Sequence, residues 1–180
     1  MSNGKRRYWL AVIGWALSVA TVQAANNGVE IDMSGTVVAS TCDVETADAL
    51  QTIFIGNFSS NTFHTAGDVS STADLVIRLK NCSSGISGAT VMFSGTPDGD
   101  NGKLLALSDT AGKGNMASGV GVEILDANKK TVAINTASDS QSLQEGDNNA
   151  LTFFLRYQAT KIPVTAGNAS SVMYFDLSYQ

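Results

Sequence analysis

Residues 171–180 read Ser-Val-Met-Tyr-Phe-Asp-Leu-Ser-Tyr-Gln, and this stretch decides the fold class. Met173, Phe175, Leu177 and Tyr179 alternate with Tyr174, Asp176 and Ser178. Successive side chains of a β-strand point to opposite faces, so this period of two predicts a strand with one apolar face. Because the pattern continues to Gln180, we expect no later strand of the chain to pair beyond it.

The same period of two dominates the rest of the chain, whereas helical periodicity is scarce. Turn-forming clusters of Gly, Asn, Asp and Ser separate the candidate strands, which indicates a β-sandwich or barrel in a single domain. The Gly- and Ala-rich stretch Thr110–Ser118 is expected to be a mobile loop. The candidate strands are Val29–Val38, Leu50–Phe58, Ala73–Cys82, Ala89–Ser94, Lys103–Leu107, Gly119–Leu125, Thr131–Asn135, Leu151–Lys161 and Ser171–Tyr179.

The first candidate strand has one apolar and one polar face. Its odd positions are Val29, Ile31, Met33, Gly35 and Val37, and its even positions are Glu30, Asp32, Ser34 and Thr36. On the pattern alone, an ordinary first strand of the sandwich is the favoured interpretation.

The N-terminus carries the features of an export signal. Lys5, Arg6 and Arg7 precede the mostly apolar stretch Leu10–Val22, and Val22-Gln23-Ala24 places small residues where a signal peptidase cleaves. A membrane anchor is the alternative, but a span needs about 20 apolar residues. We therefore expect residues 1–24 to be a cleaved signal peptide and no membrane insertion of the mature chain.

Cleavage leaves an acidic protein. The signal takes three of the eleven Lys and Arg and none of the sixteen Asp and Glu, so the formal net charge falls from −5 to −8. The remaining basic residues are scattered along the chain. Nucleic acid and anionic membranes require clustered cations, so nucleic acid is not an expected partner.

Cys42 and Cys82 are the two cysteines of the chain, and both lie in the exported part. An even pair in an oxidising compartment predicts a disulfide. Reactive or metal-binding thiols are the competing interpretation, but neither a CxxC spacing nor histidine partners are present.

No pattern in the sequence favours catalysis. The single histidine, His64, lies in a polar stretch and is expected at the surface, and no Gly-x-Ser-x-Gly elbow occurs. Residues 98–102, Asp-Gly-Asp-Asn-Gly, lack the ligand spacing of an EF-hand calcium loop and favour a hairpin turn. We predict no enzyme activity, no cofactor and no metal site.

Several of these features together resemble the subunits of chaperone–usher pili. The segment 35–42, Gly-Thr-Val-Val-Ala-Ser-Thr-Cys, is similar to the one that leads into the first cysteine in that family. The second cysteine ends the strand segment 79–82, a glycine (Gly167) stands near the C-terminus, and the penultimate residue is Tyr179. The segment 159–167 looks like the minor tip-adaptor pilins of type 1 fimbriae.

The resemblance implies an incomplete immunoglobulin-like sandwich that lacks its last strand. Residues 25–38 would be an N-terminal donor strand extension, with Val29, Ile31, Met33, Gly35 and Val37 facing a neighbour's groove, and residues 39–180 the pilin domain. The acceptor side would comprise Gly167, Met173, Phe175, Leu177, Tyr179 and Gln180, the last anchored by basic residues of a chaperone.

The resemblance also implies the partners and the location: a periplasmic pilus chaperone, an outer-membrane usher and neighbouring pilin subunits, with the chain ending in a fimbria on the bacterial surface. The function implied is that of a structural subunit polymerising by donor-strand exchange. The alternative is a self-contained secreted β-sandwich that binds a glycan or protein through its loops.

Overall fold

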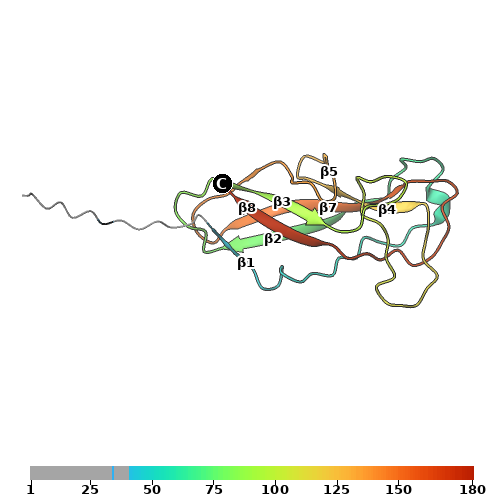
Figure 1. The fold of residues 1–180 in the computed structure, drawn as a ribbon, viewed down its shortest axis with the longest axis horizontal. Helices are drawn as coiled ribbons and strands as arrows, with labels where there is room; N and C mark the ends of the chain where they lie inside the picture. Colours follow the sequence, from blue (N-terminus) through green and yellow to red (C-terminus); the bar gives the residue numbers. More distant parts are fainter. Residues whose placement is uncertain (1–33, 35–40) are drawn as a thin grey trace, which may run out of the picture. The chain divides into compact units, whose positions relative to one another are not determined.

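The computed structural model describes residue 34 and residues 41–180, and within them the fold is all-β with two antiparallel sheets. Figure 1 shows the strands. The first sheet has the order β1-β2-β7-β4-β5, and the second has the order β6-β3-β8. The bounds in the first sheet are β1 Asp43–Val44, β2 Ala73–Lys80, β4 Val120–Leu125, β5 Thr131–Val132 and β7 Asn149–Ala159. Those in the second are β3 Gly88–Ser94, β6 Gln141–Ser142 and β8 Tyr174–Tyr179, and a short 3-10 helix, η1, covers Ser60–Thr62.

The core lies between the two sheets. Strand β7 buries every odd residue from Leu151 to Ala159, as its alternation predicts. Phe93 of β3 meets Phe153 of β7 edge to face, with ring centroids 4.9 Å apart. Both rings are fully buried, and such a pair adds about 0.5–1.5 kcal/mol beyond the burial of its area. This contact holds the second sheet against the centre of the first.

Most of the longer strands agree with the sequence prediction to within a few residues, but two predicted strands are wrong. Leu50–Phe58 and Lys103–Leu107 form no strand. The second of these buries the adjacent residues Leu104 and Leu105 and pairs only through isolated bridges at Leu105. The predicted strand Thr131–Asn135 shortens to β5, and the brief strands β1 and β6 were not predicted. The candidate strand Val29–Val38 lies outside the described residues.

The predicted disulfide is confirmed. Cys42 is bonded to Cys82, and the two are 40 residues apart in the sequence. The bond lies beside the pairing of β1 with β2, where Asp43 is opposite Lys80. It therefore ties the start of the described domain to the end of β2.

Candidate strand-acceptor groove

Strand β8 is an open edge. It pairs with β3 on one side (Figure 1). The register runs from Ala89 opposite Tyr179 to Ser94 opposite Tyr174. Within residues 41–180, no strand pairs with its other side. The backbone N–H and C=O groups on that side are therefore available to another strand.

The side chains of β8 follow the alternation read from the sequence. Phe175, Leu177 and Tyr179 of β8, and Met173 just before it, are half-buried and pack against the core. The even residues face outward, and Tyr174 is 72% exposed. The inward row is only partly covered, although Met, Phe and Leu are among the residue types most often found fully buried.

Residues 50–58 form the facing edge. Ile53, Ile55 and Phe58 are half-buried against the core, whereas Leu50 is 90% and Phe54 is 73% exposed. No backbone hydrogen bond among the described residues involves this segment. It was predicted as a strand, and its side chains alternate like those of one, but a strand needs a ladder partner and the described residues supply none.

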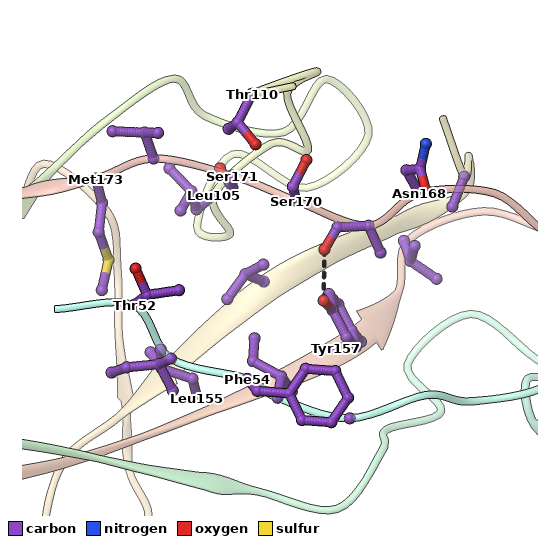
Figure 2. A pocket seen from close by; sticks show the side chains of 18 of the residues that line it. Thr52, Phe54, Leu105, Thr110, Leu155, Tyr157, Asn168, Ser170, Ser171 and Met173 are labelled. Carbon is purple, nitrogen blue, oxygen red and sulfur yellow. Dashed lines mark hydrogen bonds between the residues drawn. The ribbon is translucent and has the colours of Figure 1, made fainter. Parts of the chain in front are cut away.

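A cavity of about 1150 Å³ lies beside these two edges. Figure 2 shows Met173 on one side of it and Thr52 and Phe54 on the other, and the buried Leu155 of β7 also lines it. Further apolar floor residues are Leu75, Phe93, Leu105, Val120, Val122 and Tyr157. We call this cavity the groove.

The structure brings three of the predicted acceptor residues, Gly167, Met173 and Phe175, to the groove. Leu177 and Tyr179 continue the same half-buried row of β8 but do not line the cavity. The backbone carbonyl oxygen of Gln180 instead accepts a hydrogen bond from the Ser87 N–H at 2.8 Å. The predicted donor residues Val29, Ile31, Met33, Gly35 and Val37 lie outside the described residues.

Tyr157 is a groove residue that the sequence analysis missed. Its hydroxyl donates a hydrogen bond to the carbonyl oxygen of Ala169, drawn as a dashed line in Figure 2. Burial raises the pKa of its phenol, and Phe58 meets the ring edge to face at 6.1 Å. The sequence did hold one indication of this role. Tyr157 stands at an inward position of the otherwise apolar row of β7, and a buried phenol needs a polar partner.

His64 and residues 98–102 do not line the groove. His64 is exposed, as predicted. The Asp98 carboxylate accepts hydrogen bonds from the N–H groups of Asp100 and Asn101, both at 3.0 Å, which is the geometry of a turn. In the described part of the chain, no three His, Cys, Asp or Glu residues lie close enough together to hold a metal ion.

A fimbrial protein family model matches residues 31–180. The chain belongs to this family of fimbrial proteins. It is similar to the uncharacterized fimbrial-like protein YcbU of Escherichia coli K12, with 44% identity over 91% of each chain.

Two solved structures resemble this fimbrial subunit. One is a subunit from the structure of a chaperone–usher pilus, 25% identical, with a TM-score of 0.63 over 89% of this chain and 100% of the other. The second is the P pilus rod subunit PapA, 27% identical, with a TM-score of 0.62 over 77% of this chain and 99% of the other.

These matches identify the sandwich as the immunoglobulin-like fold of pilins. The protein is a structural subunit of the chaperone–usher class of fimbriae on the bacterial surface, from a family of pilins rather than enzymes. Within the described residues, no helix is both long and apolar enough to span a bilayer.

Proposed function

We propose that this subunit polymerises by donor-strand exchange, in which residues 25–38 of one copy fill the groove of its neighbour. The apolar side chains of Val29, Ile31, Met33 and Val37 enter the groove, and Gly35 occupies a place too shallow for a side chain. Strand addition in pilins is an established mode of peptide recognition.

The observation that carries the proposal is the pair of unpaired backbone edges beside one apolar cavity. Strand β8 lacks a ladder partner on one side, and residues 50–58 lack backbone hydrogen bonds altogether within the described chain. A single inserted strand satisfies β8 and covers the half-buried row at the same time. Each large apolar side chain that it buries fully contributes about 1.5–3 kcal/mol before ordering costs.

The same open edge accounts for the proposed partners. An uncovered apolar groove beside an unpaired strand favours aggregation. A periplasmic chaperone covers the groove first. At an outer-membrane usher, the N-terminal strand of the neighbouring subunit then replaces the chaperone. Residues 1–24 direct export and are removed, so that residues 25–38 become the free N-terminal extension.

The proposal extends to a minor, tip-adaptor position in the fibre, which is supported by the resemblance of residues 159–167 to such pilins. Counting the subunit along isolated fibres with labelled antibody tests this placement. A few copies near one end are expected, and continuous labelling along the shaft would place the subunit in the rod.

The test of donor-strand acceptance is a fusion in which a copy of residues 25–38 follows Gln180 through a short flexible linker. We expect this fusion to give a soluble monomer without the chaperone, whereas the unmodified chain is degraded or aggregates. The matched control is the same fusion with Ile31→Asp and Met33→Asp in the added copy, because a buried unpaired carboxylate is costly. A stable monomer of the unmodified chain at normal yield would rule out the open groove.

Deletion of residues 25–38 provides a second test. The subunit should keep its chaperone-bound fold and lose only its ability to donate a strand to a neighbour. Unfolding of the deleted chain would instead indicate a self-contained sandwich that uses this segment as its own first strand.

A further inference from the structure

Residues 50–58 are a loosely held segment of the domain. Phe54, in the middle of the segment, is 73% exposed. In the described part of the chain, no backbone N–H or C=O group of this segment takes part in a hydrogen bond. The segment stays on the core through the half-buried side chains of Ile53, Ile55 and Phe58. Lifting it off the domain therefore uncovers these partly buried side chains and disrupts no ladder of the described strands.

The two ends of the segment are fixed. At its start, the Gln51 side chain donates a hydrogen bond to the Val76 carbonyl oxygen of β2 at 2.8 Å. Just beyond its end, the Ser59 hydroxyl caps η1 and accepts a hydrogen bond from the Asn61 N–H at 3.2 Å. Phe54 lies between these two points, and Figure 2 shows it beside the groove. The chain around Phe54 is therefore the part of the segment that opens most easily.

Exposure of a side chain does not by itself make the backbone open. Tyr174 is 72% exposed, almost as much as Phe54, but it belongs to β8 and lies opposite Ser94 in the ladder with β3. Freeing the backbone at Tyr174 breaks part of that ladder, whereas freeing it at Phe54 breaks no hydrogen bond that the described residues form. Local opening needs least free energy where few buried contacts and few backbone hydrogen bonds oppose it. The two aromatic residues therefore differ in how firmly their backbone is held.

The exposed loop of residues 109–118 is also more firmly held. The Asn168 N–H donates to the Asn115 carbonyl oxygen at 2.7 Å, and the Ala117 N–H donates to the Asn168 carbonyl oxygen at 2.9 Å. The packing here is close, because a Cβ atom on Gly167 would lie 2.5 Å from backbone atoms of this loop. The loop also contains no Leu, Phe, Tyr or Trp.

We propose that the peptide bond between Phe54 and Ile55 is the bond that an endoprotease cuts first in a subunit whose groove is empty. The protease that fits this site has a pocket for a large apolar side chain on the residue before the cut bond, as chymotrypsin does. The reaction is hydrolysis: the C–N bond breaks, and water supplies the hydroxyl of the new carboxyl group and a hydrogen of the new amine. The inference rests on the donor-strand acceptance proposed above, because the inserted strand is what protects the bond.

Occupancy of the groove controls how easily the segment opens. A strand inserted beside residues 50–58 covers Ile53 and Ile55, which are half-buried without it. Lifting the segment then also uncovers the inserted strand. Because cleavage follows the population of the open form when opening is faster than cutting, a filled groove should slow cleavage after Phe54 by about tenfold or more. A chain that no chaperone or neighbour covers is therefore removed, and a subunit within the fibre is spared.

Chymotrypsin is the probe, applied to three forms of the whole mature subunit. The first is the unmodified chain, diluted from denaturant without chaperone. The second is the fusion that carries a copy of residues 25–38 after Gln180. The third is that fusion with Ile31→Ala in the added copy, which weakens the inserted strand without removing it. Protection of the β7 amides from hydrogen exchange shows that a form is folded when it is cut, and the two fusions decide the result if the unmodified chain does not refold.

The disulfide makes a cut after Phe54 easy to recognise. This bond lies between Cys42 and Cys82, so the two fragments stay joined until the disulfide is reduced. A first cut after Cys82 instead releases a fragment without reduction. Residues 25–40 contain no Leu, Phe, Tyr or Trp, so they offer chymotrypsin no preferred bond. Mass spectrometry of the reduced fragments then identifies the bond that was cut.

We expect the rate of cleavage after Phe54 to follow the strength of the inserted strand. The unmodified chain should be cut fastest, and the Ile31→Ala fusion should be cut about tenfold or more faster than its parent fusion, since Ile→Ala is costly at a buried site. Phe54→Gln removes the side chain that the protease pocket takes and should slow this cleavage about tenfold or more. Tyr174→Gln is the matched control, because Tyr174 is equally exposed but lies in a ladder, and it should leave the rate within about twofold.

The two proposals fail in different ways. If the fusion is no more often a monomer than its control with Ile31→Asp and Met33→Asp, donor-strand acceptance itself is overturned. If the fusion is a stable monomer but its Ile31→Ala variant is cut after Phe54 no faster, only the inference about this bond is overturned. A first cut at another bond in every folded form overturns it as well.

Discussion

The hydroxyl of Tyr179 donates a hydrogen bond to the backbone carbonyl oxygen of Cys42, at 2.9 Å. Tyr179 ends β8 in one sheet, and Cys42 immediately precedes β1 in the other. The bond therefore joins the two sheets next to the disulfide between Cys42 and Cys82. Burial raises the pKa of the Tyr179 phenol above its ordinary value of 10.0, which is already well above neutral pH, so the hydroxyl is protonated and can donate.

Removing this bond should weaken the fold. In the fusion that carries its own donor strand, we expect Tyr179→Phe to lower the free energy of unfolding by about 0.5–1.5 kcal/mol, the usual contribution of one hydrogen bond. Denaturant unfolding gives the value. Tyr174→Phe is the control, because Tyr174 is 72% exposed, and an equal loss there would contradict the role of the bond to Cys42.

The inward row of β8 should decide how well a donor strand binds. Phe175 is half-buried and lines the groove, whereas Asp176, the next residue, is exposed. We expect Phe175→Ser to weaken binding of the peptide of residues 25–38 about tenfold to a hundredfold, since a buried apolar side chain contributes about 1.5–3 kcal/mol. Asp176→Ser should leave the affinity within about twofold. Titration of chaperone-bound subunits with labelled peptide measures both, and similar losses would show that β8 does not present its odd face to the donor.

The buried carboxylate of Asp48 fastens the chain that precedes residues 50–58 to β2. The Asp48 side chain is 5% exposed and accepts hydrogen bonds from the Arg78 N–H at 2.7 Å and the Arg78 Nη1 at 3.1 Å. Asp48→Ala leaves that N–H without its partner, so we expect a loss of about 1.5–3 kcal/mol in the free energy of unfolding of the fusion. Glu45→Ala removes a half-exposed carboxylate 3.9 Å from Lys80 and should cost at most about 1 kcal/mol. Equal losses in the free energy of unfolding for the two variants would mean that burial does not strengthen the interactions of Asp48.

Much of this fold could be predicted from local pattern. The alternation of β7 reports a face that is buried within the same chain, and that of β8 reports a face that is half-buried against the core. An even cysteine pair in an exported protein implies the disulfide that is observed. Residues 103–107 were misassigned because Leu104 and Leu105 are both buried in a connection between sheets. Their apolar character resembles that of a strand, but burial on both sides of the backbone is not alternation.

Less of the groove than of the strands could be predicted from the sequence. Residues 50–58 alternate like a strand, but pairing is a property of two segments, and the described chain offers this one no partner. The need for glycine at residue 167 depends on residues 115–117, about fifty positions earlier. Long-range packing of this kind leaves no local pattern, so a family resemblance could mark Gly167 without giving its reason.

The turn of residues 64–68 should make stability depend on acid pH. The Asp68 carboxylate accepts hydrogen bonds from the N–H groups of Thr65 at 2.8 Å and His64 at 2.6 Å, and these bonds, that of Thr65 first, hold the pKa of Asp68 below its ordinary value of 3.8. A carboxyl group whose pKa is lower in the folded state stabilises the fold above its unfolded pKa. This contribution is lost as the pH falls from about 3.8 through the lower folded pKa.

Asp68→Asn tests this directly, because the amide does not titrate. The thermal midpoint of the fusion should be lower in the variant than in the wild type at pH 6, and the difference should shrink between pH 4 and pH 2. NMR titration of the Asp68 side chain gives the folded pKa independently. A midpoint difference that stays constant down to pH 2 would show that the ionised carboxylate is not what stabilises this turn.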